Sequence, residues 1–321
     1  MAQRELIVLG SAAQTPTRER NHNGYLLRWD REVLLFDPGE GTQRQMLFAG
    51  VSAAKLTRIL ITHFHGDHCL GLPGVIQRLS LDQAPGPVDV YFPAEGQQYF
   101  DNLRGAAAFH ETTPLRVAPC QEGVVFAGPP FSLSARALDH RVPTLGWRLE
   151  EPERAHLDPD RLAASGLTGA AIGDLQREGS TVVDGRTVAL EQVSDRTPGQ
   201  RFAFVMDTRL CDAAFELARD ADLLVCEATY LNADADLADR YKHLTAGQAG
   251  RIAAEAGARR LLLTHFSQRY GDPQLFLDQA REHFDDVVLA ADLTRVAVPD
   301  RRRATLVHPD NQDAPHDPLD R

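Results

Sequence analysis

The feature that most constrains this chain is a histidine-rich loop directly after an apolar, strand-like run. Residues 59–62 are apolar up to Thr62, and His63-Phe64-His65-Gly66-Asp67-His68 follows them. Gly66 allows a tight reversal, so the loop can turn its four potential ligands toward one point. Imidazole and carboxylate donors together suit Zn²⁺, and also Mn²⁺ or Fe. A solvated polar loop or a lone structural metal is the plainer alternative, but this spacing favours a metal site at a strand end.

Three further residues, His140, Asp207 and His265, also follow apolar runs. Four ligands in one short loop would crowd a single tetrahedral ion, and a catalytic site needs an open position. A two-metal site sharing a wider ligand set is therefore predicted. Taken alone, His140 or His265 is as easily structural. The sequence of 60–64 nevertheless returns almost unchanged at 262–266, as expected if two halves of a duplicated sandwich both supply one site.

Short strand-like runs alternate with helical patterns along most of the chain. The strand-like runs lie at 6–9, 33–36, 59–62, 88–92, 202–206, 223–226, 261–264 and 287–290. Helical patterns occupy 70–80, 212–220, 245–257 and 273–284, with Thr245 as a plausible N-cap. Several strands are apolar on both faces, which is typical of strands covered by helices. The alternation predicts an α/β fold.

Two stretches depart from this pattern. Residues 150–200 contain ten acidic residues, five arginines and no lysine, a net charge of −5, and few apolar runs. We predict that they form an arm projecting from a hydrolase domain spanning 1–300. Residues 301–321 are rich in charged and polar residues and are predicted to be a disordered tail.

Composition narrows the class of protein. With 43% hydrophobic and 25% charged residues, the chain can build a core and is not disordered as a whole. A net charge of −11 excludes a general basic coat but not a local basic groove. Four scattered cysteines without a C-x-x-C pair fit a reducing cytoplasm. No apolar run resembles a signal peptide or a membrane span, so no membrane association is expected.

The ligand order resembles that of the metallo-β-lactamase fold, an αββα sandwich with a two-metal site on one edge, over about residues 4–298. The resemblance implies one zinc ion on His63, His65 and His140. It implies a second on Asp67, His68 and His265, with Asp207 bridging the two. Paired metals ~3.5–4 Å apart clamp the attacking and leaving oxygens of a displacement. Asp67 counts among the catalytic residues as well.

Six further segments resemble, in the right order, the motifs of ribonuclease Z, the tRNA 3′-processing endonuclease. They lie at 16–21, 35–45, 71–74, 226–230, 243–246 and 264–270. The resemblance implies a metal-dependent hydrolase that removes 3′ trailers from tRNA precursors. It also implies a homodimer.

Roles follow for residues outside the ligand set. Cleavage to a 3′-hydroxyl needs a proton for the leaving oxygen, which His243 could donate while Glu227 orients its ring. Arg269 could grip a phosphate with its forked donors, and Ser267 could bond the same group. The structural alternatives are a surface histidine ahead of a helix, an ordinary surface arginine and a loop-capping serine. Asp37 is expected in a turn behind the ligands.

The stretch 150–200 differs from the family. Short ribonuclease Z enzymes usually carry an arm with a Gly-Pro motif and lysines that clamp the tRNA elbow, and residues 166–179 have neither. An acidic arm is a poor clamp, because phosphate contacts dominate tRNA affinity. If tRNA is the substrate, we expect Arg161, Arg177 and Arg186 to make the contacts. Two alternatives stay open: a hydrolase of a small or cyclic phosphodiester or another ester, and a non-catalytic, metal-stabilised scaffold.

Overall fold

The computed structural model describes residues 4–300, which fall into two compact units. The first contains residues up to 150 and from 201 to 299, and the second contains residues 151–200. The disordered tail predicted for 301–321 lies outside the described residues. No helix within 4–300 is long and apolar enough to span a membrane.

The first unit is built on two seven-stranded mixed sheets. The strands of one sheet are, in spatial order, β18 (Arg295–Ala297), β1 (Arg4–Gly10), β2 (Gly24–Trp29), β3 (Glu32–Phe36), β4 (Arg58–Leu60), β5 (Val88–Pro93) and β6 (Leu115–Cys120). Those of the other are β17 (Val287–Leu289), β16 (Leu261–Thr264), β15 (Leu223–Glu227), β14 (Arg201–Val205), β9 (Thr144–Glu150), β8 (Phe131–Leu138) and β7 (Gly123–Gly128). In each sheet, successive strands on one side run parallel, and β4, β14 and β16 among them lead toward the site.

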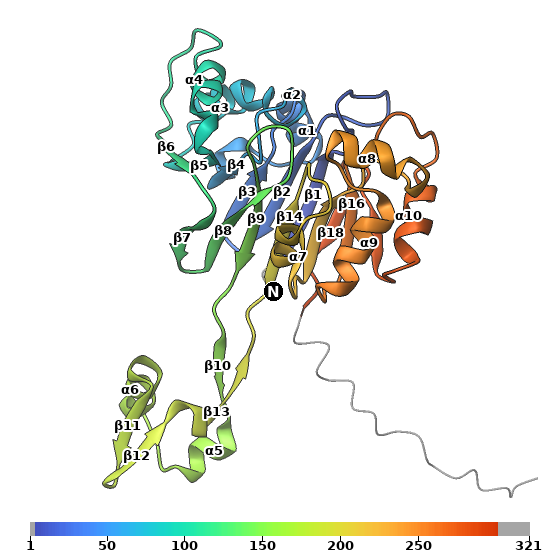
Figure 1. The fold of residues 1–321 in the computed structure, drawn as a ribbon. Coiled ribbons are helices and arrows are strands. Elements are labelled where there is room, and N and C mark those ends of the chain that lie inside the picture. Colours follow the sequence, from blue (N-terminus) through green and yellow to red (C-terminus); the bar gives the residue numbers. More distant parts are fainter. Residues whose placement is uncertain (1–3, 301–321) are drawn as a thin grey trace, which may run out of the picture. The chain divides into compact units, whose positions relative to one another are not determined.

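Helices cover the outer face of both sheets, giving four layers (Figure 1). One set is α1 (Thr42–Phe48), α2 (Gly66–Cys69), α3 (Leu72–Leu81) and α4 (Gln97–Arg104), and the other is α7 (Asp212–Ala218), α8 (Ala235–Tyr241), α9 (Ala246–Glu255) and α10 (Gln274–Arg281). Residues of β1 alternate between two cores, as the twofold period of a strand requires. Ile7 packs with α1 and α3, whereas Leu6 packs with the second sheet. The fold is the predicted αββα sandwich.

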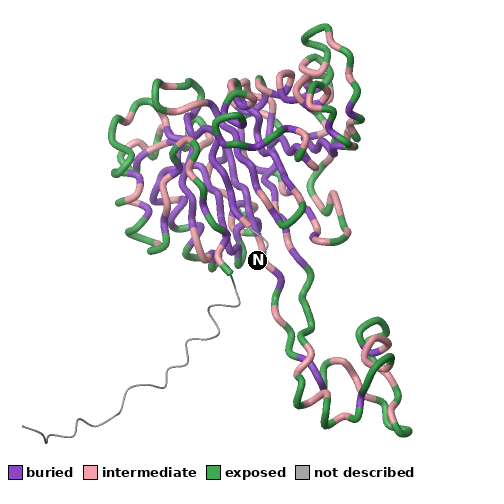
Figure 2. The backbone as a smooth tube through the Cα atoms, turned by 180° about the vertical axis from the view of Figure 1, so that it is seen from behind, coloured by how far each residue is buried: buried purple, intermediate pink, exposed green. Residues whose placement is uncertain are grey.

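The core between the sheets is dense with aromatic rings. The rings of Phe36 and Phe204, from opposite sheets, lie 4.8 Å apart between centroids, and those of Tyr25 and Phe204 lie 5.2 Å apart. Figure 2 shows this interior as a continuous block of buried chain. Aromatic pairs of this kind add to the stabilisation that comes from burial alone.

Each of the eight strand-like runs coincides with a strand, and each of the four helical patterns contains a helix. The Thr245 N-cap is confirmed, because its side chain accepts from the backbone N–H of Gln248 in a capping box. Strands β2, β6, β7, β8, β9 and β18 are additional. β8 alternates buried and more accessible positions, whereas β6 and β7 have no buried position.

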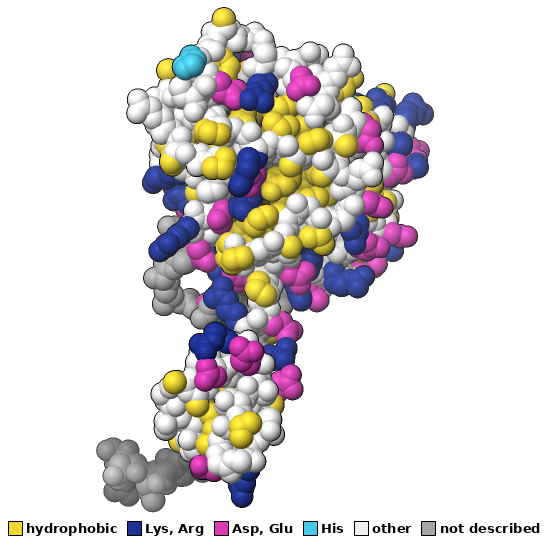
Figure 3. Space-filling view, turned by 90° about the vertical axis from the view of Figure 1, so that its left-hand side faces the viewer, with side chains coloured by type: hydrophobic (Ala, Val, Ile, Leu, Met, Phe, Trp, Pro, Cys, Tyr) yellow, Lys and Arg dark blue, Asp and Glu magenta, His cyan; other side chains and the backbone are white. Residues whose placement is uncertain are grey.

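The second unit is a small folded body. It pairs β10 (Arg154–Leu157) with β13 (Ser194–Thr197) and β11 (Ser180–Val183) with β12 (Arg186–Ala189), and it adds α5 (Pro159–Ala164) and α6 (Ala170–Glu178). Leu167, Leu175 and Val193 form its core. Basic and acidic side chains lie side by side on the face drawn in Figure 3. A stretch with few apolar runs therefore still has a core of its own.

Candidate metal centre

The seven residues predicted as metal ligands converge beyond the strand ends of both sheets. His63 follows β4, His140 follows β8, Asp207 follows β14 and His265 follows β16. The sequence repeat at 60–64 and 262–266 thus spans the ends of β4 and β16, one strand in each sheet. The strand-end prediction places these side chains correctly.

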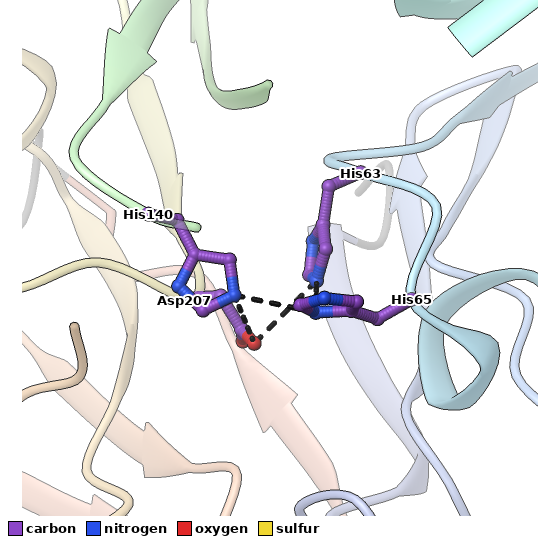
Figure 4. A group of neighbouring side chains, drawn as sticks. All are labelled: His63, His65, His140 and Asp207. Carbon is purple, nitrogen blue, oxygen red and sulfur yellow. Dashed lines mark hydrogen bonds and ion pairs between the residues drawn. The ribbon is translucent and has the colours of Figure 1, made fainter. Parts of the chain in front are cut away.

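One cluster contains His63, His65, His140 and Asp207, whose ligand atoms all lie within 4.8 Å of one another. His63 Nε2 is 2.9 Å from His65 Nδ1, and His140 Nε2 is 3.3 Å from the same atom. Asp207 Oδ2 lies 3.5 Å from His63 Nε2 and 3.6 Å from His140 Nε2. Figure 4 shows the four side chains pointing toward one another, His63 and His65 from one loop and His140 and Asp207 from two other segments.

A second cluster contains Asp67, His68 and His265, again within 4.8 Å. Asp67 Oδ2 lies 3.3 Å from His68 Nε2 and 3.5 Å from His265 Nε2. The other carboxylate oxygen of Asp207, Oδ1, lies 3.4 Å from His68 Nε2 and 3.3 Å from His265 Nε2. Asp207 therefore presents one oxygen to each cluster, which is the position of a bridge.

These side chains fit metal ions better than they fit one another. Asp207 Oδ1 and His265 Nε2 are buried without a hydrogen-bond partner, and such atoms are costly unless something binds them. The nitrogens of three imidazoles crowd together around His65 Nδ1. A cation at the centre of each cluster would satisfy lone pairs that the chain leaves unpaired.

Burial sets the charge of the ligands. It lowers the pKa of His63, His65 and His140, so these rings stay neutral, the form that binds a metal. Burial raises the pKa of Asp207, but His265, His68 and His63 outweigh it and hold the pKa below its ordinary value. His63, His65 and His140 are thus neutral and Asp207 is ionised. For His68, burial lowers the pKa but Asp207, Asp67 and Asp37 outweigh it and hold the pKa well above its ordinary value, so this ring loses a proton when it binds a cation.

Asp37 stands directly behind the ligands. Its fully buried carboxylate accepts hydrogen bonds from Thr62 N and Oγ1, both at 2.7 Å, and from His68 Nδ1 at 2.8 Å. The bond to His68 fixes the ring so that Nε2 faces Asp67 and Asp207. Asp37 thus orients a ligand, as expected for the turn after β3.

The residues around the site adopt an unusual backbone conformation. Asp37, Asp207 and His265 have φ values of 44°, 47° and 61°. This left-handed region is uncommon for residues with a Cβ, although Asp and His enter it more readily than most. The turns at three strand ends are therefore strained where they present polar side chains to the site.

His243 and Glu227 form a pair beside the clusters. His243 Nδ1 lies 3.1 Å and 3.2 Å from the two oxygens of Glu227, which also accepts from the backbone N–H groups of Thr208 and Leu244. Burial lowers the pKa of His243, but Glu227 and Asp207 outweigh it and raise the pKa to about 9. His243 Nδ1 is engaged by Glu227, which leaves its Nε2 for other partners.

Some residues at the site carry no sequence signal of their own. The Thr229 hydroxyl lies 2.5 Å from Glu227 Oε2 and 2.7 Å from His265 Nδ1. It therefore links the His243–Glu227 pair to the predicted metal ligand His265. Asp139 accepts from Lys242 Nζ at 2.7 Å and from Arg209 Nε. These contacts cross up to about 100 residues of sequence, and only the tertiary fold discloses them.

A cavity of about 790 Å³ opens over the two clusters. Arg269 and Ser267, predicted to contact phosphate, line it together with His243. Its wall also includes Arg141 and Tyr241, which the sequence did not single out. Sequence pattern offered no reason to choose them, because an arginine after a ligand and a tyrosine ending a helix are common surface residues.

Comparison with known proteins agrees with this architecture. The sequence profile of the metallo-β-lactamase superfamily matches residues 17–208, and that of a β-lactamase superfamily domain matches 180–266. Human short-form tRNase Z superimposes with a TM-score of 0.68 at 25% identity, covering 92% of this chain and 100% of that one. YhfI, a metallo-β-lactamase-fold protein of Bacillus subtilis, has a TM-score of 0.67 at 20% identity, covering 92% and 99% of the two chains. Fold and site thus define a metallo-β-lactamase superfamily hydrolase.

Sequence relatives define the family within that class. Ribonuclease Z of Nocardia farcinica is 58% identical over 305 residues, 94% of this chain and 100% of the relative. Ribonuclease Z of Streptomyces coelicolor is 55% identical over 305 residues, with the same coverage of each chain. The chain belongs to the ribonuclease Z family.

Proposed function

We propose that this chain removes the 3′ trailer of tRNA precursors as a binuclear, metal-dependent endoribonuclease. The observation that carries the proposal is identity of 55–58% with enzymes named ribonuclease Z across 94% of the chain. The cavity provides what such an enzyme needs: two clusters of ligand atoms joined by Asp207, with a histidine–glutamate pair beside them.

His63, His65 and His140 would hold one ion, Asp67, His68 and His265 the other, and Asp207 both. The grouping is supported by the two sets of mutual distances within 4.8 Å and by the two faces of the Asp207 carboxylate. When bound, two divalent ions supply charge stabilisation for the phosphate and a water acidic enough to attack at neutral pH. The chain itself fixes the spacing of the ligands.

His243 supplies the proton for the leaving 3′ oxygen. Glu227 holds Nδ1, so the proton to be transferred sits on Nε2, and the carboxylate stabilises the charged ring before transfer. Glu227 is completely buried and accepts four hydrogen bonds. These bonds hold its carboxylate in a fixed position, which in turn orients the His243 ring. Asp67 belongs to the same reaction centre, because its Oδ2 lies 3.3 Å from His68 Nε2 and 3.5 Å from His265 Nε2, where the three would hold the second ion.

Arg269 and Ser267 bind the phosphate. Ser267 Oγ accepts from the backbone N–H of Arg269 at 3.3 Å, which shapes the loop after β16 and keeps both side chains at the cavity wall. The Arg269 guanidinium has no ion pair within 4–300, so its donors are available to a phosphate oxygen.

Four finer features belong to the same proposal. Zinc is the ion that three imidazoles and carboxylates suit best. The assembly is a homodimer, consistent with exposed Leu47 and Phe48 on α1. The compartment is the cytoplasm, consistent with four free cysteines. Residues 1–300 form one hydrolase domain into which 150–200 is inserted as a tRNA-binding arm.

Cleavage of a 3′-extended tRNA, with the cut site mapped, tests the function directly. Bis(p-nitrophenyl) phosphate serves as the comparison substrate, and Asp207→Ala as the inactive control. We expect one cut near the end of the acceptor stem. Turnover of the small diester alone would favour the small-phosphodiester alternative, and no turnover of either would favour the metal-stabilised scaffold.

A further inference from the structure

An exposed arginine–tyrosine pair lies at the wall of the cavity and has no role in the chemistry above. The guanidinium carbon of Arg141 lies 4.6 Å from the centroid of the Tyr241 ring, so the two stack as a cation–π pair. Both residues line the cavity, and Tyr241 keeps 38% of its surface exposed. Such a pair offers a positive charge and an aromatic surface at the same point.

The pair is fixed relative to the metal ligands by hydrogen bonds. Arg141 directly follows the ligand His140, and Tyr241 directly precedes Lys242. His140 Nδ1 donates to the Lys242 carbonyl at 3.0 Å, and Lys242 Nζ donates to Asp139 at 2.7 Å. The two short segments are therefore clasped together, and neither stacking partner has to be ordered when a ligand arrives.

Arg141 also has an unused charge. Its neighbours Lys242 and Arg209 both pair with Asp139. Among residues 4–300, Arg141 has no carboxylate partner, and it and Arg269 are the only arginine or lysine side chains that line the cavity. A guanidinium left free beside a centre that takes a phosphodiester is placed to bind a second phosphate of the same strand.

We propose that Arg141 and Tyr241 bind the nucleotide next to the scissile phosphate, with Arg141 on its backbone phosphate and Tyr241 stacked on its base. This proposal rests on the proposed function and extends it to substrate specificity. Arg141 occupies one face of the Tyr241 ring, which leaves one face for a base. The pair thus distinguishes a polynucleotide from a small phosphodiester, which has no neighbouring base or phosphate to offer.

The first test separates Arg141 from an ordinary surface arginine. Arg281, on α10, is equally exposed and has no ion pair within the described residues, but it lies outside the cavity wall. With 3′-extended tRNA, Arg141→Ala should raise KM about 10-fold while kcat changes less than about 3-fold, the signature of lost uniform binding. It should also reduce the salt dependence of binding by about one unit in the log–log slope. Arg281→Ala should change neither.

The second test asks whether Tyr241 stacks on a base. Tyr241→Leu should raise KM roughly 10-fold, and Tyr241→Phe should restore most of the affinity because the ring remains. Substrates with an abasic site on one side or the other of the scissile phosphate complete a double-mutant cycle. At one of these two positions, the abasic substitution should weaken binding to the wild type but add nothing for Tyr241→Leu.

The outcomes are distinct. If the wild type cleaves the tRNA but Arg141→Ala matches Arg281→Ala, the binding role of Arg141 is wrong while the proposed function stands. Additive effects of Tyr241→Leu and both abasic sites would overturn the stacking role in the same way. If the wild type does not cleave the tRNA at all, the proposed function fails, and this inference fails with it.

Discussion

The arginines of the second unit and those at the cavity of the first unit are used in opposite ways. In residues 151–200, four of five arginines pair with nearby acids: Arg154, Arg161, Arg177 and Arg196. Arg186 is the exception among the described residues. At the cavity of the first unit, Arg141 and Arg269 have no acidic partner. The second unit thus has more arginines than the cavity wall, but among residues 4–300 fewer of them lack an acidic partner.

The difference shows that charge counts do not measure what a surface can bind. An arginine already paired with a carboxylate must exchange one partner for another when a phosphate arrives, so its net gain is small. An arginine without an acidic partner gives up only its bound water when it binds a phosphate. The net charge of −5 in 150–200 predicts a weak clamp, but it does not tell which arginine lacks an acidic partner.

The largest effect should come from breaking the metal centre. Asp207→Ala removes the one carboxylate that faces both clusters, so we expect loss of nearly all turnover on tRNA and on small diesters. Elemental analysis should find two metal ions per chain in the wild type and fewer in Asp207→Ala. A wild-type enzyme with one firmly bound ion per chain and full activity would contradict the two-metal scheme.

Removing the proton donor should have a smaller and substrate-dependent effect. His243→Ala should lower kcat on tRNA by roughly 10²–10⁴, the usual range for general-acid catalysis. The loss should be much less with bis(p-nitrophenyl) phosphate, because nitrophenolate leaves without a proton. Metal content, measured on the same samples, should stay unchanged. Equal losses on both substrates would mean that His243 positions the substrate instead.

Removing the second unit tests whether it contributes to affinity alone. Glu151 N donates to Gln200 O at 3.0 Å, so the ends of the insertion are adjacent and a short Gly-Ser linker can replace 152–199. We expect a strongly raised KM for tRNA with little change in kcat on bis(p-nitrophenyl) phosphate. Unchanged tRNA cleavage with no change in salt dependence would show that this unit does not bind the substrate.

The smallest effect is expected from single arginine substitutions in the second unit. Arg186→Ala should lower the salt dependence of tRNA binding by about one unit in the log–log slope, because a free cation neutralises a phosphate outright. Arg177→Ala should change it less, since Asp174 already holds the Arg177 guanidinium. Equal slopes for the two variants would remove the distinction between paired and free arginines.

The sequence allowed us to predict residues whose type and local pattern indicate metal binding. It did not allow us to predict residues whose role depends on partners that are distant in sequence. His63 and His265 were found because histidines after apolar runs are unusual. Thr229 and Asp139 were missed because their partners are distant in sequence and threonines and aspartates are common. Arg141 and Tyr241 required knowledge of which loops meet. Strands β6 and β7 were missed even though residues 124–127 of β7 are apolar, and the structure buries none of their residues.

The strained turns at Asp37, Asp207 and His265 have a consequence for the descent of such chains. Each non-glycine residue in the left-handed region costs on the order of 1–3 kcal/mol, and glycine would remove most of that cost. Selection for activity opposes the substitution by glycine, because glycine has no side chain to bind a metal. A related chain that is no longer selected for activity gains stability from the same substitution. Glycine at the position of Asp207 or His265 would therefore mark a descendant that keeps the fold and has lost the reaction.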